Sequence, residues 1–371
     1  MSKLDELIQE LCPDGVKYRT LEDCCIILDS KRKPITKAKR VAGEFPYYGA
    51  NGVQDYVNDY LFEGKFVLVG EDGSVLTTSG KPVVNWAEGK IWVNNHAHII
   101  SEKPGVNLRY LFYYLQTVNI TDLVHGNIPK LTGKDFKAIK TPIPPMEIQK
   151  EIVCLLDDFT AKTAELQAEL NKEYEARMKQ YYYYRNELLD GDFEIPKMKL
   201  KDVVVIQRGK RVVKTELTED GNYPVYQNAL APMGYYHSKN RDKDNTYLIS
   251  AGAAGSIGYS TNDFWAADDC FTFKCAEILD NKFLYYSLLN KQSAINLKIR
   301  NASIPRLSRD SLENLVISIP SLNNQKKIVE ILEKFDYACS TLQSNISIEI
   351  ESRQKQYEFY RDKLLTFKEL K

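Results

Sequence analysis

The stretch RMKQYYYYRNELL (Arg177–Leu189) occurs a second time, 176 residues later, as RQKQYEFYRDKLL (Arg353–Leu365), with eight of thirteen positions identical. The same offset relates QKEIVCLLDDF, which starts at Gln149, to QKKIVEILEKF, which starts at Gln325. An internal repeat decides the architecture of a chain before any other feature does. We therefore interpret this sequence as two copies of one unit.

Shorter matches extend the repeat toward the start of each copy, with small gaps between them. The matched pairs are IPKL (128–131) and IPRL (304–307), LED (21–23) and LKD (200–202), FPYY (45–48) and YPVY (223–226), GS (73–74) and GS (255–256), and IWVNN (91–95) and FWAAD (264–268). Each copy thus has a divergent part of roughly 125 residues, followed by a better matched tail of roughly 45 residues.

The two tails are predicted to be long helices, because apolar or small residues recur in them at intervals of three and four. This stripe comprises Leu156, Phe159, Thr163, Leu166 and Leu170, and then Leu332, Phe335, Cys339, Leu342 and Ile346. No Gly or Pro interrupts 147–190 or 322–371, and about 43 residues at ~1.5 Å each make a rod of roughly 60 Å. We expect the stripes to pack on each other. Tyrosines of the two opening stretches continue this seam at Tyr181, Tyr184, Tyr357 and Tyr360.

Each divergent part is predicted to be a compact mixed domain of strands with a few helices. Short apolar runs bounded by Gly, Asn and Asp are typical of strands and turns; they are FVLVG (66–70), IWVNN (91–95), HAHII (96–100), TYLIS (246–250) and CFTF (270–273). NLRYLFYYLQ (107–116) and NKFLYYSLL (281–289) are typical of helices. The predicted fold class is α+β, with two mixed α/β domains joined by two long helices.

The composition, 43% hydrophobic and 27% charged, indicates a globular protein and excludes a disordered or collagen-like one. The chain has no run of 18 apolar residues, and acids interrupt its first segment, MSKLDELIQEL, so we expect a cytoplasmic protein. Seven cysteines without a CxxC pair favour reduced thiols. A net charge of zero excludes a uniformly basic nucleic-acid binder, but it leaves room for local basic loops.

Two basic stretches follow a short apolar strand at nearly corresponding places in the two copies. They are KRKPITKAKR (31–40), with six cations in ten positions, and RGKRVVK (208–214). Flexible cations on a loop suit contact with DNA phosphates, whereas a solvated surface loop is the alternative. Recurrence of the loop favours DNA. The candidate contacts are Lys31, Arg32, Lys33, Lys37, Lys39 and Arg40 in the first copy, and Arg208, Lys210, Arg211 and Lys214 in the second.

Polar side chains beside turns are candidates for contacts with bases. Asn and Gln pair with adenine edges and Arg pairs with guanine. The candidates lie in YYGANGVQ, HGNIPKL, VYQNAL and RNASIPRL, and they are Tyr48, Asn51, Asn127, Lys130, Gln227, Asn228, Asn301 and Arg306. Asn is also common in tight turns, so Asn51-Gly52 can equally be a turn without contact to DNA.

Motifs for catalysis are mostly absent from the sequence. The glycine-rich stretches 70–81 and 252–258 lack the spacing of nucleotide-binding loops. His96 and His98 share one face of a strand, but no third ligand stands nearby, so packing or hydrogen bonding is favoured over zinc. We expect no catalytic residue, no cofactor and no metal.

The order of these motifs resembles the specificity subunit of type I restriction-modification systems. The resemblance rests on FPYYGANG, a strand ending at Gly70, the GS pair, WVNNHA, a YLFYYL helix, IPKLTGKDF, and PIPPMEIQKEIV leading into a long helix, all of it present twice. It covers nearly the whole chain and includes the opening LDELIQELCPDGVKY. The second copy departs by reading SIPSLNNQKKIV, with one proline where the first has two.

The resemblance implies a division of labour. Two target-recognition domains each read one half of a bipartite site in double-stranded DNA, and the family's conserved helices form an antiparallel coiled coil that fixes their separation. The helices also dock methyltransferase subunits, two of them, which bind S-adenosylmethionine and methylate adenine, and restriction subunits join to cut DNA. The helix at 2–11 lies by the C-terminal helix and completes a pseudo-twofold cycle. The chain itself performs no chemistry.

This interpretation divides the chain into five segments. They are an N-terminal helix and lead-in (1–16), target-recognition domain 1 (17–146), conserved helix 1 (147–190), target-recognition domain 2 (191–321) and conserved helix 2 (322–371), with the two helices acting as coiled-coil spacers.

Two alternatives stay open. Asp59, Glu63 and Lys65 weakly resemble the D…ExK set of a metal-dependent nuclease, although their spacing is cramped and the second copy does not repeat it. The other alternative is a scaffold whose mixed domains bind proteins rather than DNA. Neither the DNA target nor the spacer length can be predicted from spacing alone, because base choice depends on loop geometry and DNA shape.

Overall fold

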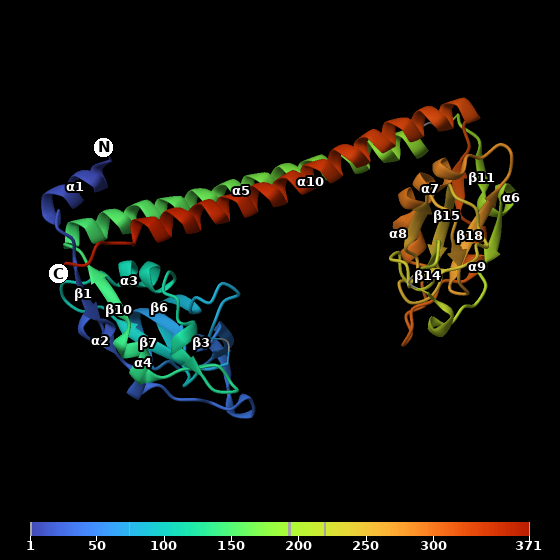
Figure 1. The fold of residues 1–371 in the computed structure, drawn as a ribbon. Coiled ribbons are helices and arrows are strands. Elements are labelled where there is room, and N and C mark those ends of the chain that lie inside the picture. The colour runs from blue at the N-terminus through green and yellow to red at the C-terminus, as the bar shows by residue number, and fades with distance from the viewer. Residues whose placement is uncertain (1, 74, 192–193, 219, 371) are drawn as a thin grey trace. The chain divides into compact units, whose positions relative to one another are not determined.

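We describe the protein from a computed structural model, which covers residues 2–73, 75–191, 194–218 and 220–370. The chain divides into two compact units, unit 1 with Met1–Ala168 and Ile348–Lys371, and unit 2 with Glu169–Ser347. Each unit holds one mixed domain and a part of each of two long helices (Figure 1). Within the described residues, no helix is long and apolar enough to cross a membrane.

Unit 1 contains a six-stranded sheet with the strand order β2-β7-β5-β6-β3-β4. The strands are β2 (Ile26–Ile27), β3 (Ala42–Gly49), β4 (Gly52–Val57), β5 (Phe62–Gly70), β6 (Val84–Val93) and β7 (Ala97–Ser101). Neighbouring strands are antiparallel, except that β3 and β6 run parallel. Val67, Leu68 and Val69 of β5 are all 0% exposed. Because both faces of this strand are covered, its sequence is a continuous apolar run.

Short helices and ladders complete the domain of unit 1. They are β1 (Lys17–Thr20) paired with β10 (Lys140–Ile143), β8 (Val124–His125) paired with β9 (Lys130–Leu131), α2 (Leu21–Cys24), α3 (Leu108–Leu115), α4 (Gly133–Ala138), and the 3-10 turns η1 (Asp29–Lys31), η2 (Lys37–Lys39) and η3 (Thr121–Leu123). The side chain of Asn107 caps α3 by accepting from the backbone N–H groups of Arg109 and Tyr110. This helix packs against β5 and β6.

Unit 2 contains a four-stranded sheet with the order β12-β18-β15-β16 and a three-stranded sheet with the order β14-β13-β17. These strands are β12 (Val204–Arg208), β13 (Tyr223–Tyr226), β14 (Tyr235–Tyr236), β15 (Asn245–Ile249), β16 (Ile257–Ser260), β17 (Trp265–Ala266) and β18 (Cys270–Cys275). The remaining elements are β11 (Lys197–Lys199) paired with β19 (Val316–Ser318), α6 (Leu200–Val203), η4 (Lys214–Glu216), α7 (Asn281–Asn290), α8 (Gln292–Asn296) and α9 (Arg309–Glu313).

The two domains share one plan. The order β12-β18-β15-β16 corresponds to β2-β7-β5-β6. In each domain the strand of the FPYY or YPVY motif pairs in parallel with a strand that carries a tryptophan, so that Tyr47 lies opposite Trp92, and Val225 opposite Trp265. The FPYY/YPVY and IWVNN/FWAAD matches of the sequence are therefore equivalent positions in the fold.

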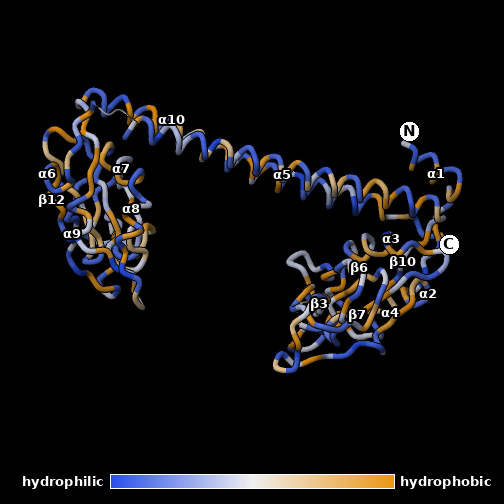
Figure 2. Tube along the Cα trace, turned by 180° about the vertical axis from the view of Figure 1, so that it is seen from behind, coloured by the Kyte–Doolittle hydropathy of each residue, from blue (hydrophilic) through white to orange (hydrophobic). Residues whose placement is uncertain are grey.

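The long helices are α5 (Met146–Asp190) and α10 (Leu322–Leu364), which lie side by side in both views (Figures 1 and 2). Figure 2 shows apolar and polar residues alternating along both helices. In unit 2 the Tyr174 hydroxyl donates to Gln343 over 3.4 Å, and the ring of Tyr181 lies 6.1 Å from that of Phe335. A later residue of α5 thus contacts an earlier residue of α10, so the two helices are antiparallel. The predicted fold class is confirmed.

The four consecutive tyrosines do not all enter the seam. Tyr181 is buried against Phe335, and Tyr184 stacks on the same ring while part of it stays exposed. Tyr182 and Tyr183 face solvent. A helix presents only one residue in three or four to a single neighbour, so a run of four tyrosines must place some of them outside the contact.

The end of α10 differs from the sequence prediction. The helix was expected to continue to residue 371, but it ends at Leu364. The chain then runs beside the start of the domain, where Val16 N–H donates to Lys368 O over 2.9 Å and Leu370 N–H donates to Val16 O over 2.8 Å. These backbone hydrogen bonds require an extended chain.

The predicted N-terminal helix is present as α1 (Lys3–Leu11), which begins with a capping box between Ser2 and Asp5. Its buried Leu4 belongs to the same apolar cluster as Leu156 of α5 and Leu365 just beyond α10. Lys3 forms an ion pair with Glu151 of α5. The helix at 2–11 therefore lies against both long helices of unit 1, as the resemblance implied.

Candidate nucleic-acid interface

The first basic loop, 31–40, is held to its domain by two of its own arginines. The Arg32 side chain is 11% exposed and its guanidinium donates to Glu71 over 2.7 Å and to the carbonyl of Ala97 over 2.6 Å. Arg40 pairs with Asp55 over 3.2 Å and lies 4.2 Å above the ring of Tyr47. Both guanidinium groups are therefore engaged within the domain, although the sequence had made them candidate DNA contacts.

The four lysines of this loop differ from the arginines. Lys31, Lys33, Lys37 and Lys39 are exposed, and no ion pair involves them within the described part of the chain. Lys37 and Lys39 lie on the short 3-10 turn η2. These ammonium groups remain available to a polyanion.

A tryptophan of the adjacent strand binds the backbone of each basic loop. In unit 1, Lys33 N–H donates to Val93 O over 3.3 Å, and the indole of Trp92 donates to Lys33 O over 2.7 Å. In unit 2, Lys210 N–H donates to Ala266 O, and the indole of Trp265 donates to Lys210 O, both over 2.9 Å. The two basic loops thus occupy equivalent positions.

The second basic loop is also exposed. Arg208, Lys210, Arg211 and Lys214 all face solvent. The guanidinium of Arg208 donates to the carbonyl of Asp268 over 2.7 Å, and within the described residues no ion pair involves the other three. Arg241 was not among the predicted residues. Its guanidinium connects strand β18 to the start of this loop, because it donates to Thr272 over 2.5 Å and to Arg208 O over 3.2 Å.

The IPKL and IPRL motifs lie against the end of the central strand in their domains. Leu131 N–H donates to Glu71 O over 2.8 Å, and Leu307 N–H donates to Ser250 O over the same distance. This pairing places the exposed candidates Lys130 and Arg306 at equivalent positions. Asn127 and Asn301, a few residues earlier, are also exposed.

The candidates beside the FPYY and YPVY strands are less accessible. Tyr48 and Gln227 are half-buried, whereas Asn51 and Asn228 are exposed. Asn51 precedes Gly52, whose φ of +91° forms the tight turn between β3 and β4. The turn that the sequence allowed is present, and the Asn51 side chain projects from it into solvent.

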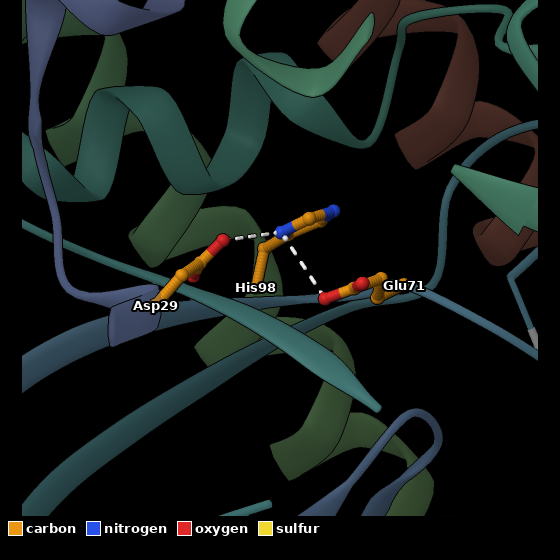
Figure 3. A group of neighbouring side chains, drawn as sticks. All are labelled: Asp29, Glu71 and His98. Carbon is orange, nitrogen blue, oxygen red and sulfur yellow. Dashed lines mark hydrogen bonds and ion pairs between the residues drawn. The ribbon is translucent and has the colours of Figure 1, made fainter. Parts of the chain in front are cut away.

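A buried ion-pair cluster connects several of these segments in unit 1. Figure 3 shows His98 between Asp29 and Glu71, with its Nδ1 at 2.6 Å and 3.6 Å from their carboxylates. Arg32 lies beside both carboxylates, and Lys130 lies 3.3 Å from Glu71. One carboxylate, Glu71, therefore links the basic loop, strand β7 and the IPKL loop.

The cluster has the ligand types of a metal site, since one atom from each of Asp29, Glu71 and His98 lies within 4.8 Å of the others. The positive charge is already present, because Arg32 and Lys130 balance the two carboxylates. His98 Nε2 also faces the carbonyl of Leu131 over 3.0 Å. Both ring nitrogens of His98 thus already face an acceptor, so we assign the cluster to ion pairing.

Charge pairing sets the protonation of Asp29. Burial alone would raise the pKa of this carboxyl group, but the hydrogen bond from His98, the charge of His98, the Ile99 N–H and the charge of Arg32 together hold the pKa below its ordinary value. The carboxylate is therefore ionised at neutral pH. Asp29 and Glu71 were not among the predicted residues; the only signal in the sequence was that Glu71 directly follows a buried strand.

The residues of the nuclease alternative do not assemble a site. Lys65 pairs with Glu88 over 3.2 Å, Asp59 accepts from the neighbouring Tyr60 N–H, and Glu63 is exposed. A metal-dependent nuclease needs these carboxylates to converge on one ion.

The chain matches the family model described as type I restriction modification DNA specificity domain twice, over residues 13–176 and 192–352. A Haemophilus influenzae protein that carries the name of a type I restriction enzyme specificity subunit is 36% identical over 95% of this chain and 96% of its own length. The specificity subunit of the Escherichia coli type I restriction enzyme EcoR124I/EcoR124II is 29% identical over 70% of this chain and 71% of its own.

Solved structures share the fold. A chain from a study of complex assembly in the type I R-M system superposes with a TM-score of 0.72 at 15% identity, covering 96% of this chain and 98% of that one. The HsdS subunit from Thermoanaerobacter tengcongensis gives 0.57 at 15% identity, covering 96% and 97%. At this identity the likeness is one of fold.

Proposed function

The chain belongs to the type I restriction modification DNA specificity family, and we propose from this membership that it selects the DNA target of a type I restriction-modification complex. In this proposal the domain of each unit reads one half of a bipartite site, and the paired helices set the spacing between the halves. The chain performs no chemistry itself. The observation that carries the proposal is that one fold plan occurs twice while the exposed residues of the two domains differ.

Phosphate contact is assigned to the exposed cations of the two basic loops. Such contacts position a protein on DNA without reading sequence. The assigned residues are Lys31, Lys33, Lys37 and Lys39 in unit 1, and Arg208, Lys210, Arg211 and Lys214 in unit 2. Arg32 and Arg40 take a different role in this proposal, because their guanidinium groups hold the loop in place.

Base contact is assigned to polar side chains of the neighbouring motifs. Asn51, Asn127 and Lys130 in unit 1, and Asn228, Asn301 and Arg306 in unit 2, are exposed. Tyr48 and Gln227 are half-buried and contribute through their accessible edges. Asn, Gln and Arg have the donor and acceptor pattern that distinguishes bases in the major groove.

We further propose that the long helices bind two copies of one partner, a methyltransferase subunit. The support is a pair of exposed apolar patches at repeat-related positions. Patch 1 comprises Leu155, Phe359 and Tyr360 in unit 1, which are 41, 65 and 44% exposed; patch 2 comprises Ile331, Tyr183 and Tyr184 in unit 2, which are 40, 62 and 42% exposed.

The two patches also match in geometry. The rings of Phe359 and Tyr360 lie 5.4 Å apart at 75°, and those of Tyr183 and Tyr184 have the same separation and angle. In unit 1, Leu155 and Tyr360 line a groove of 670 Å³ between α1, α5 and α10. Exposed apolar residues that recur together at equivalent positions mark an interaction surface, so we assign the equal patches to equal partners.

Mapping methylated adenines tests the proposal. DNA is treated with the chain plus its methyltransferase subunit, with each protein alone as a control. The expected result is methylation in two short sequences separated by a fixed spacer, only when both proteins are present.

Three outcomes would contradict the proposal. Methyl transfer by the chain alone would make it an enzyme. Methylation that does not depend on the chain would favour the scaffold alternative. Magnesium-dependent cutting by the chain alone, abolished by Glu63→Ala with Lys65→Ala, would favour the nuclease.

A further inference from the structure

We infer that Trp92 and Trp265 are equivalent positioning residues, which fix the backbone of the two basic loops so that their cations meet the DNA phosphates in a set register. This inference rests on the proposed function. It concerns the indole N–H groups, since neither tryptophan was among the candidate residues and neither needs to touch DNA for this role.

The first support is that the same two-bond clamp is built twice. The backbone of one loop lysine, Lys33 or Lys210, donates to the strand residue that follows the tryptophan, and its carbonyl accepts from the indole. The loops share little sequence, KRKPITKAKR against RGKRVVK. Because the hydrogen bonds are the same while the surrounding residues differ, we attribute to them the position of the loop backbone.

The second support is the way each tryptophan is itself held. Trp92 pairs in register with Tyr47, and Trp265 pairs with Val225, in the parallel ladders of the two domains. The ring of Trp265 also packs edge-on against Tyr236 at 4.8 Å. An indole has only two rotatable side-chain bonds and a single donor, so a tryptophan fixed in a sheet presents its N–H at one defined place.

The third support is that other anchors act on the same short stretch of backbone. In unit 1 the Tyr47 hydroxyl accepts from Ile35 N–H over 2.9 Å. In unit 2 Gly209 N–H donates to Cys270 O over 2.9 Å, and an added Cβ at Gly209 would lie 2.0 Å from Ala267 O. Each loop is thus pinned by its backbone at the lysine and beside it.

Pinning the backbone leaves the side chains free. The loop lysines are exposed, so their ammonium groups stay mobile, and contact with a polyanion does not require them to be fixed. The backbone of the loop is already ordered, so it loses little conformational entropy when DNA binds. If the tryptophan served only the core, its indole would have no reason to reach the same carbonyl in both domains. Both indoles are, moreover, only partly buried.

The test measures DNA binding by the chain together with its methyltransferase subunit, using a fluorescently labelled duplex of random sequence at several salt concentrations. The variants are Trp92→Phe and Trp265→Phe. Trp86→Phe is the matched control, because the indole of Trp86 lies on the same strand as Trp92 but donates to Glu88. Lys37→Ala with Lys39→Ala reports on the loop cations themselves.

We expect Trp92→Phe and Trp265→Phe each to weaken binding about two- to tenfold, the loss that accompanies one hydrogen bond. The slope of log affinity against log salt should also become shallower, since fewer cations reach phosphates together. A general loss of folded protein would lower the active fraction and leave this slope unchanged. Trp86→Phe should match the unaltered chain in both measurements.

Coupling separates the inference from the proposed function. The lysine changes should cost less in the Trp92→Phe background than in the unaltered chain, because the loop is already displaced. If the lysine changes alter neither affinity nor slope, the proposed phosphate contact of loop 1 fails. If they weaken binding but Trp92→Phe behaves as Trp86→Phe does, the positioning inference is wrong and the proposed function stands.

A second variant guards against a packing defect caused by phenylalanine. Trp92 is replaced by its benzothiophene isostere, in which sulfur takes the place of the indole N–H, so shape is kept and the donor is lost. A reduced salt slope with the isostere supports the inference, whereas an unchanged slope overturns it.

Discussion

Gln149 and Gln325 make the same three hydrogen bonds in the two halves of the chain. The Gln149 amide donates to Gly105 O and Pro144 O and accepts from Asn107 N–H; the Gln325 amide donates to Ile278 O and Pro320 O and accepts from Asp280 N–H. Both side chains are completely buried. Each glutamine fastens the first turn of a long helix to the residue that caps the adjacent domain helix.

Removing either amide should therefore destabilise its own unit. Gln149→Ala leaves two buried carbonyls and one N–H without a partner, which costs about 2–3 kcal/mol of the free energy of unfolding. Gln325→Ala should cost about as much. Urea unfolding measures both, and Gln167→Ala on the exposed face of α5 is the control. Equal stability of Gln149→Ala and Gln167→Ala would show that the three hydrogen bonds of the Gln149 amide do not stabilise unit 1.

The ion-pair cluster of Figure 3 predicts a dependence of stability on acid. Because pairing lowers the pKa of Asp29 from its ordinary 3.8, its contribution is present in full above pH 3.8 and is lost as the pH falls from there through the lowered pKa. Asp29→Asn should remove this part of the acid sensitivity.

At neutral pH, Asp29→Asn should lower the stability of unit 1 by about 3 kcal/mol, since it removes one of the two carboxylate partners of Arg32 and of the buried His98. Chemical denaturation from pH 7 down to below the lowered pKa of Asp29 measures the difference between variant and unaltered chain. Asp59→Asn, at an exposed carboxylate, should change neither value. A constant difference across the whole pH range would argue against ionised Asp29 as the source.

The long helices and the two mixed domains could be predicted from the sequence because their signals are local or repeated. The stripe from Leu156 to Leu170 has helical spacing, and FVLVG is a short continuous apolar run, which is typical of a buried strand. The end of α10 at Leu364 could not be predicted, since nothing in TFKELK prevents a helix. Its extended course depends on hydrogen bonds to Val16, at the other end of the chain.

The DNA interface stays a prediction, but the structure shows which side chains of the predicted segments are exposed and which are already paired. A cation count finds both basic loops, but it cannot separate Lys37, which is exposed, from Arg32, which pairs with a carboxylate 39 positions away. Arg241 and Trp92 were missed because their roles are hydrogen bonds to distant backbone. Such contacts leave no periodic trace in the sequence.

The matched patches predict independent loss of two partners. Phe359→Ser should weaken binding of the partner at patch 1 about tenfold (~1.4 kcal/mol), and Tyr183→Ser should do the same at patch 2, because each removes an exposed aromatic anchor. Sedimentation at subunit concentrations near the dissociation constant of the unaltered complex should then show reduced occupancy of one site for either variant and of both sites for the double variant.

Tyr337→Ser is the matched control for these two changes. Tyr337 is 74% exposed on α10, but its repeat counterpart is Ala161, so it belongs to no repeated patch. It should leave the stoichiometry unaltered. If Tyr337→Ser sheds a partner as readily as Phe359→Ser, the repeat would not define the docking surface.

The segment after α10 should stabilise the start of unit 1. Phe367 O accepts from the Tyr18 hydroxyl over 2.9 Å, and Lys368 and Leu370 bond to the backbone of Val16. Stopping the chain after Thr366 removes these three bonds and should cost unit 1 about 2 kcal/mol.

Hydrogen exchange locates this effect within one sample. Amides of β1 and β10 in unit 1 should exchange faster after the truncation, whereas the equivalent pair β11 and β19 in unit 2 should keep their rates, because the removed residues bond to Val16 and Tyr18 of unit 1. Gly15→Ala should mimic the truncation, since a Cβ at Gly15 would lie 2.5 Å from Lys368 O and its φ of +121° disfavours any side chain. Unchanged exchange in β1 with both changes would mean that the terminal contacts contribute nothing to the fold of unit 1.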